Sequence, residues 1–437
     1  MSVSPVLDET ILKTVETRLA ATDKLLERSY PGDSGARQPV HTAYVPADKF
    51  TAEVAGQWGQ QALAAARDFG GLAVLARAVG LDAEGGADAS GGSRADLLAE
   101  LVAQKLEREP IEDLRIDFED GLGHRPDDEE DAHAIRAAQE VNRAVAAGIA
   151  PPFIGIRFKC FEVPTRKRAL RTLDLFIASL VESGGLPDGL VLTLPKVSTV
   201  AQVEAMVFVC EKMEAAHGLP ARRLRFEVQM ETPQLILSAE GTVPSAQLIH
   251  AGRGRVSSLH YGTYDYSASL GISAEYQSME HPAADHAKNV LQVAVAGTGV
   301  HLSDGSTNIL PIGESEHVSK AFALHARLVR RHLERGIYQG WDLHPAQLAT
   351  RYLATYAFYR DGFDAAANRL RNYVHQVESS IMDEPATARA LAMFIYRGLV
   401  CGALTAGEVE NGVEITQEHL RALALGRPAI NAKESHV

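Results

Sequence analysis

A carboxylate stands in an unexpected place in the segment RFEVQMETPQLIL, residues 225–237. Phe226, Val228 and Met230 alternate with more polar neighbours at the two-residue period of a β-strand. The Thr-Pro pair that follows is a strand breaker, so Glu231 is predicted to lie at the C-terminal end of the strand. A carboxylate at that place is either a ligand for a bound group or an exposed side chain without a role.

Other strand-like segments of the sequence also end on polar side chains. This set consists of Asp117, Glu119, Asp120, Arg157, Lys159, Lys196, Asp265, Asp304 and His344. Carboxylates that converge on one rim repel one another unless a cation lies among them. Hard oxygen ligands of this kind suit Mg²⁺ or Mn²⁺, with water and substrate completing an octahedral shell. The residue types therefore indicate a divalent-metal site that handles a small molecule.

The elements that must position these side chains are eight short apolar segments separated by helical stretches. The segments read VHTAYVP, LRIDFED, FIGIRFK, GLVLTLPK, RFEVQME, VSSLHYG, GVHLSDG and GWDLHP. In the stretch after the fourth segment, Val203, Met206 and Cys210 fall on one helical face. Repeated strand–helix units favour a parallel sheet, and eight of them predict a closed (β/α)8 TIM barrel of the α/β class. Active sites of such barrels lie at the carboxyl ends of the strands, which is where the polar residues fall.

The barrel is expected to occupy residues 38–348, with helical additions at both ends. Residues 1–37 are predicted to form an N-terminal helical extension, and residues 349–437 a C-terminal helical domain or lid. A stretch rich in Gly, Ala and Ser at about residues 81–94 is interpreted as an inserted loop. The apolar stretch ALAMFIYRGLV in the tail is predicted to close over the barrel mouth, either that of its own chain or that of a neighbour.

Composition narrows the class of protein and its partners. The 437 residues are 46% hydrophobic, as in a globular protein, and carry a formal charge of −13, which would repel a nucleic-acid backbone. No apolar run reaches the roughly 18 residues of a membrane span, and the first residues lack the features of a signal peptide, so we expect a cytoplasmic location. Cys160, Cys210 and Cys401 are far apart and are expected to be reduced and mostly buried.

Taken in order, the motifs of the chain resemble those of a known superfamily. AYVPADKF, IDFEDGLG, GIRFK, LTLPKV, VQMETPQLIL, YGTYDYSASLG, VHLSDG and GWDLHPAQL are similar to the successive motifs of citrate lyase beta subunits, malyl-CoA lyases and 2-oxo-acid aldolases of the HpcH/HpaI type. The resemblance covers residues 38–348. It implies a barrel that binds one divalent metal through Glu231 and Asp265, with Arg157 holding the carboxylate and carbonyl of the substrate. It also implies a homo-oligomer.

The same resemblance helps to choose between branches of the superfamily. Glu119 and Asp120 match its acidic pair after the second strand, but the aldolase branch has a His at the position of Asp120, so the lyase branch is favoured. An Arg common in the lyases is replaced by Val40, and an Asn after the substrate-binding Arg is replaced by Lys159. These two departures leave the substrate and the use of coenzyme A open.

The leading hypothesis is a metal-dependent carbon–carbon lyase or aldolase that acts on a small carboxylic or 2-oxo acid, or on its coenzyme A thioester. Cleavage would leave an enolate whose oxygen is stabilised by the metal. Arg157 would orient the substrate, and Asp120 or a metal-activated water would accept the hydroxyl proton. Lys196 and Asp304 are secondary candidates for substrate binding, although Lys196 could only hold the barrel rim and Asp304 could only cap a turn.

Two other functions are compatible with the sequence. One is a malate-synthase-like condensation of an acyl thioester with glyoxylate, which would require a further catalytic carboxylate in the tail, with Asp361 and Asp383 as candidates. The other is a non-catalytic barrel with a binding or regulatory role. Arg157 also has an alternative interpretation, as a structural ion pair with Glu119 or Asp117.

Overall fold

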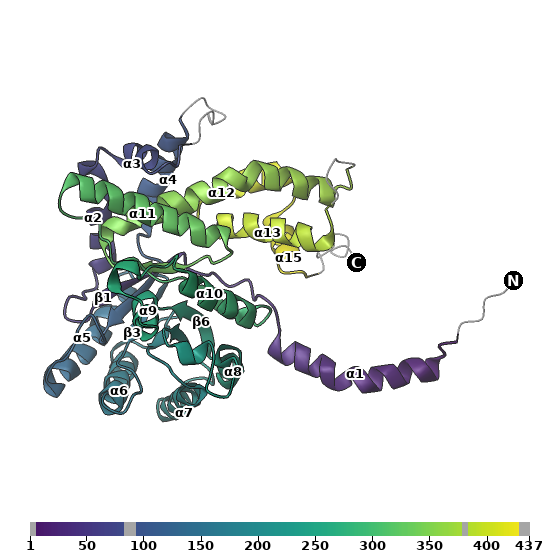
Figure 1. Cartoon of the computed structure of the whole chain (residues 1–437), viewed down its shortest axis with the longest axis horizontal. Coiled ribbons are helices and arrows are strands. Elements are labelled where there is room, and N and C mark those ends of the chain that lie inside the picture. Colours follow the sequence, from purple (N-terminus) through teal and green to yellow (C-terminus); the bar gives the residue numbers. More distant parts are fainter. Residues whose placement is uncertain (1–5, 83–92, 378–382, 428–437) are drawn as a thin grey trace.

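The computed structural model describes residues 6–82, 93–377 and 383–427 and contains an eight-stranded parallel sheet closed into a barrel (Figure 1). The strands are β1 (His41–Pro46), β2 (Asp113–Asp117), β3 (Phe153–Arg157), β4 (Leu192–Leu194), β5 (Phe226–Met230), β6 (Val256–Tyr261), β7 (His301–Ser303) and β8 (Gly340–Asp342). They pair in the order β7-β6-β5-β4-β3-β2-β1-β8. The N–H groups of Asp304 and Trp341 close the ring by donating to the carbonyls of Gln339 and Gly305, at 2.8 and 3.1 Å. The predicted (β/α)8 barrel is therefore confirmed.

Helices cover the outside of the barrel and alternate with the strands along the chain. They are α2 (Val54–Asp68), α3 (Leu72–Ala78), α4 (Arg94–Arg108), α5 (Asp127–Ala146), α6 (Arg166–Ser183), α7 (Val200–Ala216), η1 (Pro233–Leu235), α8 (Pro244–Ala251), α9 (Thr263–Ser269), η2 (Ala274–Tyr276), α10 (Pro282–Val295), α11 (Ser315–Glu334) and α12 (Pro345–Val374). α7 begins with a capping box between Thr199 and Gln202, and it buries the predicted face of Val203, Met206 and Cys210.

Polar side chains occupy much of the barrel interior. The Arg115 guanidinium is fully buried, and it donates to the carboxylates of Asp113 and Glu227 and to the Thr193 hydroxyl at 2.8 to 3.1 Å. Alternate residues of a strand share one face, so Glu227 of β5 is followed on its face by Gln229 and then by Glu231, the residue after the strand. The polar interior therefore continues into the polar rim.

The tail consists of α13 (Pro385–Val400), α14 (Ala406–Val413) and α15 (Gln417–Ala424). α13 and α14 pack on α12, and α15 packs mainly on α13. This packing builds a hydrophobic core separate from that of the barrel, formed by Ala366, Ala367, Leu370, Ala388, Ala392, Ile395, Leu404, Val409, Val413, Ile415, Leu420 and Ala424. The first half of α12 belongs to the barrel core instead, through residues that include Leu348, Tyr352 and Tyr356. The expected boundary between residues 348 and 349 thus falls inside α12.

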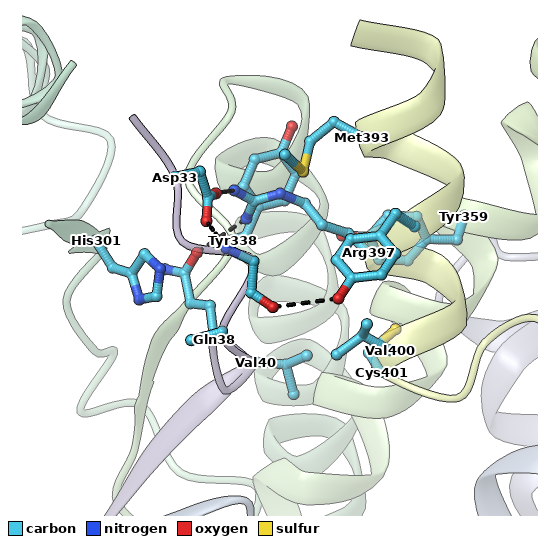
Figure 2. Close-up of a pocket in the computed structure, with 13 residues that line it drawn as sticks. Asp33, Gln38, Val40, His301, Tyr338, Tyr359, Met393, Arg397, Val400 and Cys401 are labelled. Atoms are coloured by element: carbon cyan, nitrogen blue, oxygen red, sulfur yellow. Dashed lines mark hydrogen bonds and ion pairs between the residues drawn. The ribbon is translucent and has the colours of Figure 1, made fainter. Parts of the chain in front are cut away.

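The tail lies toward the amino ends of the strands. Arg397 on α13 donates to Gln38 at 2.9 Å, and the Tyr396 hydroxyl donates to the carbonyl of Gly35 at 3.2 Å, in the segment that leads into β1 (Figure 2). His301 and Tyr338, at or just before the starts of β7 and β8, line the same pocket. The prediction that the tail closes over its own barrel mouth is therefore wrong. At 1.5 Å per residue, the 30 residues of α12 span about 45 Å, which carries the chain from the rim past the far end of the barrel.

The structure describes the expected N-terminal extension but only the ends of the expected Gly-rich loop. The N-terminal extension is a single long helix, α1 (Glu9–Ser29), followed by an extended segment that reaches β1. Most of the Gly-rich stretch, residues 83–92, lies outside the described residues. In the described ranges, no helix combines the length and the apolar character needed to cross a membrane.

Candidate active site at the carboxyl ends of the strands

Four carboxylates meet around Lys196 at the rim of the barrel. The Lys196 Nζ lies 3.3 Å from Glu119, 3.1 Å from Asp120 and 3.9 Å from Asp265. The backbone N–H of Lys196 donates to Glu231 Oε1 at 2.8 Å. These side chains come from the ends of β2, β4 and β5 and from the first turn of α9, which follows β6. The fold thus brings together residues that are up to 146 positions apart, as the strand-end pattern predicted.

Glu231 is held in place although its charge is unfavourable there. Its side chain is only 2% exposed, and burial, with the negative charges of Glu119 and Asp265, raises its pKa to about 8. Gly262 makes room for it, because a Cβ atom at that position would lie 2.5 Å from Glu231 Oε2. The fold therefore provides space for the Glu231 carboxylate, although burial makes its ionised form unfavourable.

Glu119 shares this environment. Its pKa is raised to about 7, because burial and the negative charge of Asp120 outweigh the opposing effect of the Arg157 guanidinium. Glu119 Oε2 has no hydrogen-bond partner among the described residues. By contrast, the side chain of Asp120 is 56% exposed. Glu119 is therefore the buried carboxylate of the two, and its Oε2 lies 3.4 Å from Arg157 Nη1.

Lys196 has a strained backbone as well as a central ammonium. Its φ of 48° lies in the left-handed region, which is uncommon for a residue with a Cβ. Although burial alone would lower its pKa, the carboxylates of Glu119, Asp120 and Asp265 raise the pKa of Lys196. Backbone strain of this kind tends to be found at functional sites, where surrounding contacts maintain it. Here the contacts that maintain it are the hydrogen bond to Glu231 and the ion pairs of the ammonium.

Arg157 lies beside the cluster as the last residue of β3. Its guanidinium donates through Nε and Nη2 to the two carboxylate oxygens of Asp117 at 2.8 and 2.5 Å. It also lies 4.7 Å from the ring centre of Tyr44. The structural ion pair that the sequence left open is thus present. The remaining nitrogen, Nη1, lies 3.4 Å from Glu119 Oε2 and faces the cluster.

Three side chains at the rim, Tyr44, Asp117 and Gln229, were assigned no ligand or catalytic role from the sequence, although Asp117 was among the strand-end polar residues. Asp117 accepts the backbone N–H groups of Glu119 and Gly121 at 3.0 and 2.8 Å, so it fixes both the acidic loop and Arg157. Gln229 links Tyr44 to the site. In the orientation that satisfies both ends of its amide, its oxygen accepts from the Tyr44 hydroxyl and from Arg157 Nη1, each at 3.2 Å, and its nitrogen donates to Glu231 Oε1 at 3.2 Å. The signal for Gln229 was its place in FEVQM, two positions before Glu231 and therefore on the same face of the strand.

Three of the other strand-end residues are engaged in structural contacts. Both oxygens of Asp304 accept from Lys288 on α10 at 3.0 Å, which argues against the predicted role of Asp304 in substrate binding. The Lys159 ammonium donates to Glu130 and to two loop carbonyls at 2.7 to 3.1 Å, so it holds the connection between β2 and α5. The His344 ring caps the N-terminus of α12.

The rim residues fit a divalent cation bound through few protein ligands. In the parts of the chain that the structure describes, no three His, Cys, Asp or Glu side chains form a ready-made cage. Mg²⁺ commonly takes only one or two carboxylates and keeps several waters. Glu231 and Asp265 would be these ligands, and Glu119 lies near enough to them to raise the pKa of Glu231. A cation there would relieve the repulsion that raises the pKa values of the two buried glutamates.

The raised pKa values predict an unusual dependence of stability on pH. The Glu231 pKa is about 8 in the fold against an ordinary 4.5, so between these values the folded chain binds more protons than the unfolded chain. The free energy of unfolding in EDTA should therefore fall by about 1 kcal/mol as the pH rises from 7 to 8. Denaturant titrations at these two pH values measure the change.

The window between pH 7 and 8 separates this effect from the titration of the buried histidines. The buried His260 and His332 have lowered pKa values, so they add stability only as the pH rises toward about 6.5, the range of a free histidine. Magnesium should cancel the loss between pH 7 and 8, because it binds the ionised carboxylates. A stability that rises between pH 7 and 8 in EDTA would contradict the prediction.

The fold and this rim define a (β/α)8-barrel protein with an acidic site at the carboxyl ends of its strands. More particularly, the chain belongs to the family described as Domain of unknown function (DUF6986), whose model matches residues 19–427. No curated protein was found to match the sequence.

Solved structures with a similar chain course include two of malate synthase from Haloferax volcanii. The lead(II) complex is 15% identical, with 90% of each chain covered and a TM-score of 0.47, and the magnesium/glyoxylate complex is 15% identical, with 86% of this chain and 98% of the other covered and a TM-score of 0.46. The protein CitE from Mycobacterium tuberculosis, in complex with magnesium, acetoacetate and coenzyme A, is 16% identical, with coverage of 84% and 99% and a TM-score of 0.46.

Proposed function

We propose that this protein is a Mg²⁺-dependent carbon–carbon lyase or aldolase, with Mn²⁺ as an alternative metal, that acts on a small carboxylic or 2-oxo acid or on its coenzyme A thioester. The observation that carries the proposal is the cluster of Glu119, Asp120, Glu231 and Asp265 around Lys196, next to a buried arginine. A barrel without chemistry has little reason to keep carboxylates that repel one another in a buried position. This counts against a purely structural or regulatory barrel.

Each group has a distinct task in this proposal. A bound Mg²⁺ would supply Lewis-acid stabilisation of the enolate oxygen, and Glu231 and Asp265 would hold it. Arg157 would orient the substrate carboxylate through the nitrogen that Asp117 leaves free. The hydroxyl proton of the substrate would be accepted by Glu119 rather than by Asp120. A buried carboxyl group with a pKa of about 7 can both accept and return a proton near neutral pH.

The condensation alternative loses the support expected from the tail. Asp361 is ion-paired with Arg94 and Arg330 on the outside of the barrel, and Asp383 is ion-paired with Arg369. The described part of this chain therefore offers neither carboxylate to its own rim. Cleavage and condensation nevertheless share an enolate, so one assay can examine both.

Proton exchange tests the proposal without knowledge of the full substrate. The protein is incubated in D₂O with Mg²⁺ and, in separate reactions, pyruvate, oxaloacetate with product analysis, and acetyl-CoA with and without glyoxylate. We expect metal-dependent exchange of the methyl protons of pyruvate or acetyl-CoA for deuterium by NMR, or cleavage of oxaloacetate, and we expect EDTA to abolish it. Absence of exchange, cleavage and condensation, together with no Mg²⁺ binding by calorimetry, would exclude the proposal.

Replacing Lys196 tests whether its ammonium group competes with a metal ion for the carboxylates. Lys196→Met removes an ammonium that competes with a cation for the same carboxylates, so we expect Mg²⁺ to bind more tightly, by about tenfold for 1.4 kcal/mol of lost competition. Lys212→Met, on the exposed surface of α7, is the matched control and should bind Mg²⁺ like the wild type. Calorimetry measures both, and a weaker affinity in Lys196→Met would contradict competition.

A further inference from the structure

The N-terminal helix α1 presents an apolar face to solvent. Among the described residues, α1 buries none of its 21 side chains, and Figure 1 shows it extending away from the barrel. The apolar residues on it are each 38% to 52% exposed, and they are Ile11, Leu12, Val15, Leu19, Leu25 and Leu26. In proteins, most of the stability of a helix comes from packing of its apolar face against another element. The helix therefore lacks the partner that its sequence is built to contact.

The spacing of these residues specifies the kind of partner. The apolar residues follow the alternating three- and four-residue intervals of a heptad repeat. Position a is occupied by Leu12, Leu19 and Leu26, and position d by Val15 and Thr22. This pattern packs against another helix rather than against a sheet, because each side chain inserts between four residues of a facing helix. Ile11 and Leu25 precede two of the a positions and widen the contact.

We infer that the α1 helices of two copies of this chain pair side by side in parallel and hold the copies together. The charges beside the apolar face select this arrangement. In a parallel pair, Arg18 at position g lies opposite the partner's Asp23 at position e, and the opposite signs attract. In an antiparallel pair, Glu16 would instead approach the partner's Asp23, and two acidic side chains would repel. The acidic and basic positions thus complement a second copy in one direction.

The root of α1 is fixed to the barrel, so the pairing would also set where the sites lie. The Tyr30 ring packs edge-on against His250 at the end of α8, and Gly32 donates to the carbonyl of Gly297, just before β7. Both contacts are at the amino ends of the strands. The paired helices would therefore leave from the side opposite the acidic rim, and both rims would stay open.

Association of the full-length chain tests the pairing. Leu12→Glu/Leu19→Glu should weaken self-association measured by analytical ultracentrifugation at least about tenfold, since it removes two apolar contacts from each helix. Folding should be unaffected, because α1 has no buried residue in the described chain. Thr14→Glu/Thr17→Glu adds the same charge on the opposite side of the helix and should associate like the wild type. Unchanged association of the leucine variant, or a wild-type chain that stays monomeric, would overturn the inference.

Disulfide trapping tests the direction. The three native cysteines are buried, so a cysteine added at residue 12 or 26 is the accessible thiol. In a parallel pair, Leu12→Cys and Leu26→Cys should each form a cross-linked dimer alone. Cross-linking only in a mixture of the two variants would overturn the parallel arrangement. Arg18→Asp should weaken association severalfold, and Arg18→Asp/Asp23→Arg should restore it, whereas failure of restoration would remove the proposed charge pair.

Discussion

Glu231→Gln is expected to fold and to lose at least about 10²-fold of the Mg²⁺-dependent turnover, the scale on which loss of a group that stabilises transition-state charge is felt. Glutamine keeps the size of the side chain and can still accept the N–H of Lys196, but it cannot offer a charged oxygen to a cation. In EDTA at pH 8 the variant should be more stable than the wild type, because it removes a buried carboxylate whose pKa burial has raised. This combination, lower activity with higher metal-free stability, separates a functional role from a structural one.

Its controls follow from the same cluster. Glu240→Gln makes the same chemical change at an exposed position and should leave activity and stability unchanged. Asp265→Asn should weaken Mg²⁺ binding like Glu231→Gln, and the double variant should cost much less than the sum of the two, since either loss disables a shared site. Mn²⁺ titration followed by spin resonance measures affinity directly. Equal affinity in the wild type and both single variants would eliminate the metal assignment.

Arg157→Lys is expected to lower kcat/KM by about 10²-fold, because an ammonium group cannot donate to Asp117 through two nitrogens while a third faces the substrate. The lysine would keep one bond to Asp117, so we expect a folded protein with a modest loss of stability. Steady-state kinetics and denaturant titration on the same preparation measure both effects.

Arg115 supplies the matched control for this variant. It is another buried arginine on a neighbouring strand, bonded to both carboxylate oxygens of Asp113 and of Glu227, but it lies deeper in the barrel than the rim. Arg115→Lys should therefore lower stability while sparing kcat/KM of the folded fraction. If both variants lose stability and activity in the same proportion, Arg157 acts only through the fold.

The order of the strands and the position of the rim could be predicted because both depend on local patterns. A two-residue period and a breaker place Glu231 at the end of β5, and parallel strands then bring their ends to one side. The partners of individual charges could not be predicted in this way. Asp304 pairs with Lys288, and Arg157 pairs with Asp117, through contacts that depend on side-chain packing between elements. Periodicity tells which face a residue occupies, but not which opposite charge meets it there.

The side of the barrel on which the tail lies could not be predicted from local sequence patterns, for a different reason. Its helices could be recognised from their periodicity, yet their side of the barrel depends on how far α12 continues before the chain turns. The stretch ALAMFIYRGLV is apolar on one face in either arrangement, so its composition does not distinguish the two ends of a barrel.

The continuous course of α12 has a consequence for how the protein can be divided. Tyr352 in its first half belongs to the barrel core, and Leu370 in its second half belongs to the tail core, with no break in the helix between them. If either core unfolded, the half of α12 that belongs to it would be exposed to water and would destabilise the helix. The other core depends on the same helix, so it would be weakened too. Barrel and tail should therefore melt as one cooperative unit, and the tail is not a module that recombination could exchange by a cut at residue 348.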